Sequence, residues 1–355
     1  MKRIMALMLS ALMIVGVLAG CSQNDGTEVV SAPESSSSES VESETESEPS
    51  DIPSEPEEKS VIKIAALKGP TGLGMVKLME DAENGEAANE YEFTLVGDAN
   101  EVVGKISTGE IDVAAVPTNL AATLYGKTEG GVQLAALNTL GVLYLLSSSD
   151  DINTVEDLRG KTIYATGQGS VPEYALNYIL SSNGLEPGKD VTVEYKTEHS
   201  ELATLAISGE APLCMLPEPF VTQVTAKNPD LHVVLDLTEE WDRVVDGKSV
   251  LTMGGLIVRK EFAENNKEAF DKFLEEYEDS VAYTNTQLED AAELSEKFDI
   301  MPADVAQKAI PNCNIVFLSG DEMKAKVGDF FDVLFQANPK SVGGEIPGDD
   351  FYYQK

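Results

Sequence analysis

This sequence predicts an α/β protein of two similar lobes, and three observations lead to that prediction. Short β-branched runs such as 61–67 alternate with longer helical stretches such as 171–183. Strands that alternate with helices in this way favour mainly parallel sheets covered by helices. The same order of elements starts again near residue 154, and helix–Gly–Glu–strand joins mark equivalent places at 105–111 and 205–211.

The individual elements follow from apolar runs and from the glycines that stop helices. In the first lobe we predict strands at 61–67, 91–96, 111–116, 132–137 and 141–147, with helices at 73–81, 102–108 and 119–125. In the second lobe we predict strands at 162–166, 191–195, 211–216 and 232–235, with helices at 154–158, 171–183 and 200–207. The last third adds a strand at 251–258 and helices at 267–285, 287–298, 302–309 and 321–336. We expect this tail to pack back on the first lobe, with the aromatics of its last helix in the core.

The N-terminus indicates export. Lys2 and Arg3 precede an apolar run over 4–18, which is shorter than the roughly 20 residues of a membrane span. It is typical of a signal peptide over residues 1–20. Small residues lead to Cys21 in a Leu-Ala-Gly-Cys sequence that resembles the bacterial lipobox, so we expect cleavage before Cys21 and a lipid on its sulfur. An ordinary secretory signal with an incidental cysteine is the alternative.

After Cys21, the segment up to residue 60 reads as a linker. Residues 22–60 are mostly Ser, Glu and Pro, with twelve acidic residues and one base, Lys59. Such a segment cannot bury enough apolar surface to offset its ordering entropy. We therefore expect a disordered linker whose acidic side chains repel one another. A binding tail is the alternative, although no binding motif is visible.

Composition excludes several classes of function. The formal net charge of −37 disfavours nucleic acids and anionic lipid surfaces as partners. Cys214 and Cys313 stand among apolar residues and read as core side chains. His199 and His232 have no partner at metal-ligand spacing. We therefore expect no metal, no cofactor and no catalytic cysteine–histidine pair.

Candidate ligand-binding residues follow the predicted strands. In open α/β sheets, ligands lie beyond the carboxyl ends of strands, where helix N-termini present free N–H groups. The residues in those places are Pro70, Thr71, Gly72, Thr118, Asn119, Asn138, Gln168, Gly169, Ser170, Glu218 and Pro219. Thr71, Thr118 and Ser170 also suit helix N-caps, and Ser170 with Glu173 has capping-box spacing. The glycines match neither a dinucleotide fingerprint nor a P-loop.

Glu218 is the most informative candidate, because it stands between Pro217 and Pro219 at a predicted strand end. A carboxylate held there can accept hydrogen bonds from an amine, amidine or amide. The alternative is a solvent-exposed loop glutamate.

Several motifs, in order along the chain, resemble substrate-binding proteins of the nitrate/sulfonate/taurine type, a group that includes binders of thiamine-pyrimidine precursors. They are Gly69-Pro70-Thr71-Gly72, Thr108-Gly109-Glu110-Ile111-Asp112-Val113-Ala114, Val155-Glu156-Asp157-Leu158-Arg159-Gly160-Lys161, Gly167-Gln168-Gly169-Ser170 and Pro217-Glu218-Pro219-Phe220. The resemblance implies the type II periplasmic-binding-protein fold, with two α/β lobes joined by two crossing segments. It implies hinges near 146–151 and 250–256. We divide the chain into a first lobe of 61–148 with 254–355 and a second lobe of 149–253.

The resemblance also implies a function. We expect an extracytoplasmic, membrane-anchored, monomeric receptor that captures a small organic solute for the permease of an ABC importer, without enzymatic activity. Uncharged donors and one carboxylate favour a neutral or zwitterionic solute. Many relatives have Trp before the Glu-Pro pair, whereas Leu216-Pro217 stands here, so an aromatic clamp is in doubt. The alternatives are a surface sensor not coupled to transport, and an enzyme related to pyrimidine synthases.

Overall fold

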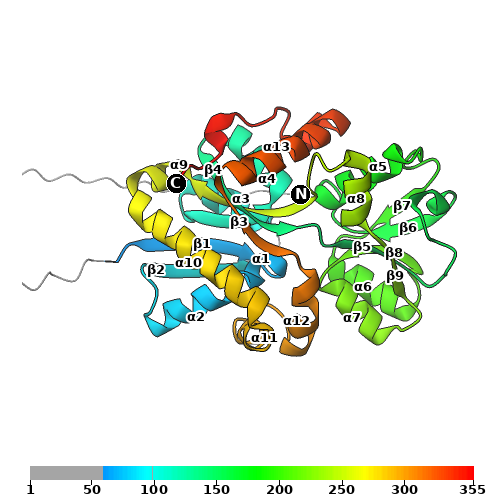
Figure 1. Ribbon diagram of the computed structural model, residues 1–355, viewed down its shortest axis with the longest axis horizontal. Coiled ribbons are helices and arrows are strands. Elements are labelled where there is room, and N and C mark those ends of the chain that lie inside the picture. The colour runs from blue at the N-terminus through cyan, green and yellow to red at the C-terminus, as the bar shows by residue number, and fades with distance from the viewer. Residues whose placement is uncertain (1–58, 98) are drawn as a thin grey trace, which may run out of the picture. The chain divides into compact units, whose positions relative to one another are not determined.

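The computed structural model describes residues 59–97 and 99–355, and it contains two sheets (Figure 1). The predicted signal peptide, Cys21 and the linker up to residue 58 lie outside the described residues. The first sheet has the strand order β11 (Ile315–Leu318), β4 (Val132–Leu140), β10 (Thr252–Arg259), β3 (Val113–Pro117), β1 (Val61–Leu67) and β2 (Glu90–Val96). The second has the order β7 (Thr192–Tyr195), β6 (Thr162–Ala165), β8 (Leu213–Pro217), β5 (Leu143–Ser147) and β9 (His232–Asp236).

The two sheets share one topology. In both, the first strand lies between the second and the third and runs parallel to them, as β1 does between β2 and β3 and β6 between β7 and β8. One antiparallel strand, β10 or β5, then separates the third strand from the next parallel one. The expected pair of α/β lobes is thus confirmed, but the sheets are mixed, because each antiparallel strand enters directly from the other lobe.

Helices cover both sheets. Around the first sheet lie α1 (Pro70–Leu73), α2 (Val76–Asn84), α3 (Asn100–Thr108), α4 (Thr118–Lys127), α9 (Lys260–Asn265), α10 (Lys267–Thr286), α11 (Leu288–Lys297), α12 (Ala303–Ala309) and α13 (Gly320–Ala337). Around the second lie α5 (Val171–Ser182), α6 (His199–Ser208), α7 (Phe220–Lys227) and α8 (Leu237–Val245). Short 3-10 turns are η1 (Val155–Leu158), η2 (Ile310–Asn312), η3 (Pro339–Val342) and η4 (Asp349–Phe351). As expected, α10 packs on α2 and β11 of the first lobe.

Glycines end the equivalent helices of the two lobes. Gly109 after α3 and Gly209 after α6 have φ angles of 76° and 81°, the left-handed conformation that glycine adopts without strain. Each places its chain at the start of the third strand of its sheet. The repeated Gly-Glu join in the sequence therefore marks the same turn in both lobes.

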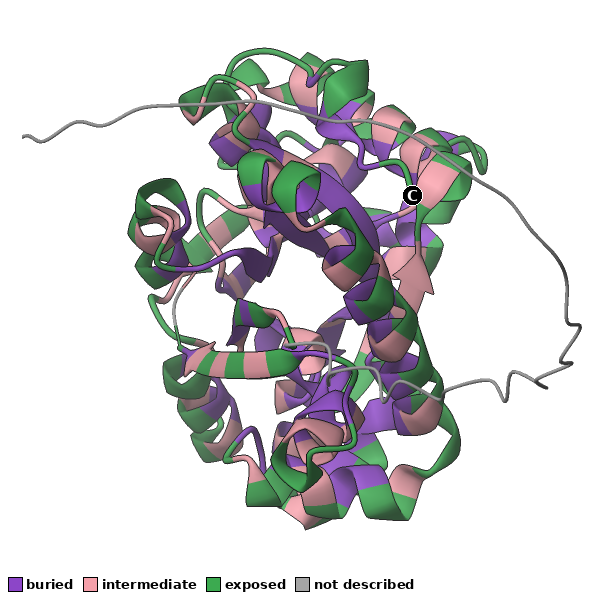
Figure 2. Cartoon of the chain, turned by 90° about the vertical axis from the view of Figure 1, so that its left-hand side faces the viewer, coloured by how far each residue is buried: buried purple, intermediate pink, exposed green. Residues whose placement is uncertain are grey.

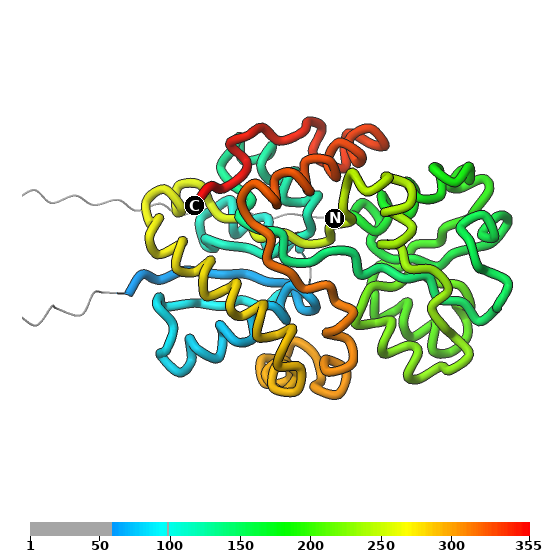
Figure 3. Tube along the Cα trace, viewed as in Figure 1, coloured from blue at the N-terminus to red at the C-terminus, as the bar shows by residue number. Residues whose placement is uncertain are grey.

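The chain crosses between the lobes twice (Figure 3). The first crossing is the short segment between Leu140 and Leu143, and the second lies between Val245 and Thr252. Strand β5 pairs with β8 and β9, so residues 143–147, which we assigned to the first lobe, belong to the second sheet. The boundary moves from 148/149 to about 141–142, because the crossing leads straight into a strand with no intervening loop.

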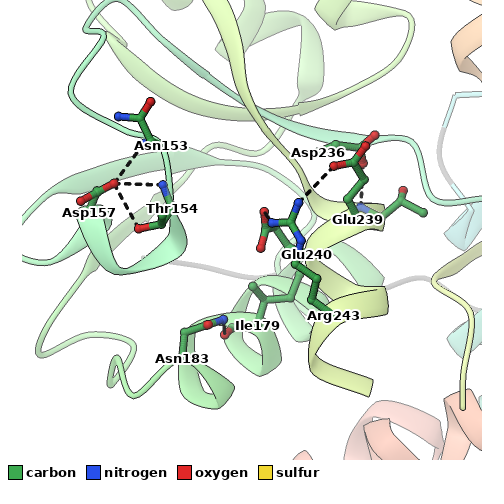
Figure 4. Close-up of polar contacts among 10 residues, drawn as sticks. Asn153, Thr154, Asp157, Ile179, Asn183, Asp236, Glu239, Glu240 and Arg243 are labelled. Atoms are coloured by element: carbon green, nitrogen blue, oxygen red, sulfur yellow. Dashed lines mark hydrogen bonds and ion pairs between the residues drawn. The ribbon is translucent and has the colours of Figure 1, made fainter. Parts of the chain in front are cut away.

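One motif of the resemblance, over 155–161, builds a turn. The Asp157 carboxylate accepts hydrogen bonds from the backbone N–H of Asn153 (3.0 Å) and Thr154 (2.9 Å) and from the Thr154 hydroxyl (3.1 Å; Figure 4). Arg159 pairs with Asp190 at 2.6 Å. These contacts fix the entry to β6, so this motif supports the second lobe.

The buried residues line the strands and the inner faces of the helices (Figure 2). One apolar cluster lies under α2, α10 and α11. A larger one contains Val116 and Phe330 of the first lobe together with Ile163 and Trp241 of the second. The hydrophobic core is therefore continuous between the lobes where α13 meets α5 and α8.

Candidate functional site

Candidate residues from both lobes lie beside the crossing between the lobes. They follow the carboxyl ends of parallel strands in each sheet. Leu143, the first residue of β5, pairs with Pro217, and the Glu218 N–H donates to the Val142 carbonyl at 3.0 Å. In the first lobe, Gly254 lies between Pro117 and Thr139.

Asn138 lies at the centre of the first-lobe part of the site. Its side chain is fully buried, and neither its amide nitrogen nor its amide oxygen has a hydrogen-bond partner. The Thr139 hydroxyl is also buried without a partner. A Cβ atom on Gly254 would lie 2.4 Å from the Asn138 oxygen and 3.0 Å from Thr71 Cγ2. The missing side chain of Gly254 therefore lets β10 approach Asn138 and Thr71.

A tyrosine from α10 joins this group. The Tyr277 hydroxyl is buried without a partner, close to Asn138 yet short of hydrogen-bond geometry. It lies 3.3 Å from the place a Cβ on Gly74 would take. Burial raises the pKa of Tyr277, so it remains a neutral phenol at physiological pH. Buried polar groups are nearly always satisfied, so this cluster requires water or a ligand.

The other first-lobe candidates serve the local structure. Thr71 lies within α1 and donates to the Leu67 carbonyl at 3.0 Å, while Gly69 is the N-cap. The hydroxyl of Thr118 lies 3.0 Å from that of Thr252, and Pro117 is the N-cap of α4. Neither threonine is thus an N-cap, contrary to that interpretation. The amide nitrogen of Asn119 donates to the Ser341 carbonyl at 3.3 Å, and its oxygen has no partner. Pro70 and Gly72 belong to α1 as well.

In the second lobe, Glu218 is 3 % exposed, so it is not a solvent-exposed loop residue. Its two carboxylate oxygens accept hydrogen bonds from the backbone N–H (3.1 Å) and the hydroxyl (3.0 Å) of Thr222 in α7. Burial raises the pKa of Glu218, and the two bonds from Thr222 oppose that rise. The carboxylate also contributes to the raised pKa values of Tyr144 and of the first-lobe residue Cys313, so it faces the junction of the lobes.

The Gln168–Ser170 loop is more open. Gln168 and Gly169 are exposed, and Ser170 is half-buried. The Glu173 carboxylate accepts from the Gly169 N–H at 2.5 Å. Ser170 is the N-cap of α5, but its side chain makes no capping hydrogen bond. The predicted capping box is therefore absent, and the Ser170 hydroxyl keeps its bonding capacity.

Further polar groups at the same edge are not among the candidates that the sequence suggested. The hydroxyl of Thr166, which follows β6, lies 2.6 Å from Nδ1 of His199 at the start of α6. Burial lowers the pKa of His199 to about 4, and its ring packs on Phe220 at 5.3 Å between centroids. Tyr195, at the end of β7, has a buried hydroxyl without a partner. His199 appeared isolated because its partners are distant in sequence, although each follows a strand.

Neither a metal centre nor a membrane span appears in the described part of the chain. Within residues 59–97 and 99–355, no three or more His, Cys, Asp or Glu side chains group so as to hold a metal ion. No helix in the same ranges is long and apolar enough to cross a membrane.

Two α/β lobes with polar loops at their junction define the class of two-lobed solute-binding proteins. The family described as "ABC transporter, phosphonate, periplasmic substrate-binding protein" matches residues 83–302. The chain belongs to this family of periplasmic substrate-binding proteins of ABC import systems, whose members are binding proteins and not enzymes. A comparison with curated proteins found no match.

Solved structures share the fold. An ABC transporter protein from Parabacteroides distasonis has 22% identity and a TM-score of 0.70, covering 84% of this chain and 100% of its own. The periplasmic aliphatic sulphonate binding protein of Escherichia coli has 16% identity and a TM-score of 0.65, covering 83% and 92%. The periplasmic nitrate-binding protein of Synechocystis has 11% identity and a TM-score of 0.56, covering 83% and 84%. These similarities confirm the type II periplasmic-binding-protein fold.

Proposed function

We propose that this chain is a lipid-anchored receptor that captures a small organic solute between its lobes and delivers it to the permease of an ABC importer. The observation that carries the proposal is the set of buried, unpaired polar groups beside the lobe crossing, with Asn138 at its centre. Leaving such groups unpaired costs about 1–3 kcal/mol each. A solute that bonds them recovers that free energy, which supports a binding role for the site.

The ligand is a neutral or zwitterionic compound that offers N–H donors. The eleven candidate residues include no Lys or Arg and one carboxylate, that of Glu218. A buried carboxylate favours an amine, amidine or amide and repels an anionic group. Although phosphonate stands in the family's description, a dianionic phosphonate without a compensating amine suits these residues poorly.

A thermal-shift screen of the mature chain tests the ligand class. Amines, amidines and zwitterions form one panel, and methylphosphonate, sulfonates and nitrate form the other. We expect at least one compound of the first panel to raise the melting temperature in a concentration-dependent way, because a ligand that binds only the folded state stabilises it by mass action. A shift produced by the anionic panel alone would refute the proposed ligand class.

The lipid anchor depends on Cys21 and has its own test. Cys21→Ser should release the protein from the membrane fraction and abolish incorporation of labelled palmitate. Cys214→Ser is the matched control, because Cys214 is fully buried in β8. Membrane association that survives Cys21→Ser would instead favour a retained signal segment.

A surface sensor is the second candidate function, since the same candidate site would serve a receptor that is not coupled to transport. Uptake of the identified solute separates the two. Deleting the gene should abolish high-affinity uptake if the chain feeds an importer, and should leave uptake unchanged if the chain only senses the solute.

A further inference from the structure

Two of the places where the lobes touch differ in character. On one side, Trp241 of α8 packs on Phe330 of α13 with 5.5 Å between ring centroids, and on Tyr178 of α5 at 5.1 Å. Trp241 and Phe330 are both fully buried. On the other side, α7 of the second lobe faces α12 of the first across a groove of about 290 Å³.

The aromatic contact resists separation more strongly than the groove does. Separating Trp241 from Phe330 would expose two large aromatic side chains that are now fully buried, which is strongly unfavourable. None of the side chains that line the groove is fully buried, so they lose little buried surface when the helices part. This difference favours a lobe movement that pivots near Trp241 and changes the width of the groove.

The groove wall is joined to the candidate site. Thr222 lines the groove, and its N–H and hydroxyl hold the Glu218 carboxylate. A solute that bonds Glu218 thus acts on the first turn of α7. The shape of the groove therefore depends both on the separation of the lobes and on whether Glu218 binds a solute.

Two lysines give the groove its charge. Lys227, in the last turn of α7, and Lys308, in the last turn of α12, line it from opposite lobes. Neither lysine side chain forms an ion pair or hydrogen bond with any residue in the described ranges. Asp304 also lines the groove, so the lining side chains carry one net positive charge on a chain whose formal net charge is −37. A locally positive surface on an otherwise acidic protein is electrostatically complementary to an acidic partner.

We propose that the α7–α12 groove is a docking surface for an acidic segment of the importer's permease. This proposal rests on the proposed transport function and adds the surface and the charge of its partner. A segment placed between the two lysines contacts both lobes at once. It therefore binds one lobe arrangement better than another, which is what a partner needs in order to distinguish them.

Photo-crosslinking in native membranes tests the surface. A photo-reactive phenylalanine analogue replaces Ala226, which lines the groove and is exposed, in the full-length chain produced in its own host. We expect an adduct with the permease subunit, identified by mass spectrometry. Lys227→Glu with Lys308→Glu should reduce that adduct at least tenfold, because like charges then oppose the partner's carboxylates.

Lys127→Glu with Lys340→Glu is the matched control, since these lysines line a separate hollow beside Thr123 and Gly343. The control should leave the adduct unchanged. An equal loss in the control, an undiminished adduct in the groove variant, or no permease adduct at all would each refute the docking surface. Thermal shifts by the solute should survive both double substitutions, so failure of the docking surface leaves the proposed receptor function standing.

Discussion

Glu218 combines two roles at the scale of a single residue, since its carboxylate holds the first turn of α7 and faces the junction of the lobes. We predict that Glu218→Gln weakens solute binding at least tenfold, because the neutral amide loses the charge-assisted hydrogen bond to a donor on the ligand. Calorimetry with the solute found by the screen measures the change. Glu210→Gln, at an exposed position of the same lobe, is the control, and equal affinities for all three proteins would remove Glu218 from the site.

The same residue gives a pH dependence of stability with a defined sign. An unfolded glutamate titrates near 4.3, and burial raises the folded pKa of Glu218 above its usual value. Between those two values the native state holds a proton that the unfolded chain has lost, so stability falls as pH rises. Glu218→Gln lacks this loss. The melting temperature of Glu218→Gln relative to that of the parent should therefore increase as pH rises from about 4.3 to the folded pKa. An unchanged difference between the two melting temperatures over this range would contradict the raised pKa.

His199 predicts the opposite slope. Its folded pKa is lowered to about 4, whereas an unfolded histidine titrates near 6.5. The stabilisation is complete above about pH 6.5 and is lost as pH falls towards 4, by at most about 3 kcal/mol. Denaturant unfolding of the parent and of His199→Gln at a series of pH values measures it. The parent should lose this part of its free energy of unfolding as pH falls, and His199→Gln should not. An equal loss in the two proteins would assign the acid sensitivity to other groups.

At this scale the sequence could locate part of the candidate site. A polar residue after a strand is visible in one dimension, and Asn138 and Glu218 are found in this way. Tyr277 could not be found, because it belongs to a long helix more than a hundred residues from Asn138. His199 requires knowing that α6 begins beside the end of β6, which depends on how the sheet is ordered.

Strand β10 shows what an element contributes, because its glycines let it lie against the site. We predict that Gly254→Ala destabilises the protein by about 1–3 kcal/mol and abolishes solute binding, since the new Cβ falls 2.4 Å from the Asn138 oxygen. Gly104→Ala in α3 is the control. It has open space around it and should stabilise the protein by about 0.5–1 kcal/mol. Chemical denaturation measures both, and a neutral Gly254→Ala would mean that the strand can move aside.

Elements with strong apolar patterns were predictable, and crossings were not. Strand β1 has the predicted bounds, and α13 differs from its prediction by one residue at each end. The helix predicted at 73–81 is instead two helices, because Gly74 and Met75 interrupt it. Strand β5 was found as a strand, yet its lobe was assigned incorrectly. Its apolar residues suit either core, and only the pairing with β8 decides between them.

For the whole molecule, the continuous core predicts that the lobes unfold together. Trp241→Ala should cost about 3–5 kcal/mol and separate the unfolding of the two lobes, because it removes the contact with Phe330. Calorimetry should give one transition for the parent and two for the variant. Phe93→Ala, at a half-buried ring of β2, is the control for lost aromatic area. A single transition in both variants would show that the crossing strands couple the lobes unaided.

Trp241 is also the only tryptophan of the chain, which gives the aromatic contact an optical consequence. Its indole is fully buried at the place where the lobes stay together, so its emission should be blue-shifted in the native protein. If the lobes move about this contact, as we propose, the emission should hold its wavelength while solute binds and move to the red when the chain unfolds. Trp241 should thus serve as an internal fluorophore that reports unfolding of the chain and does not respond to solute binding.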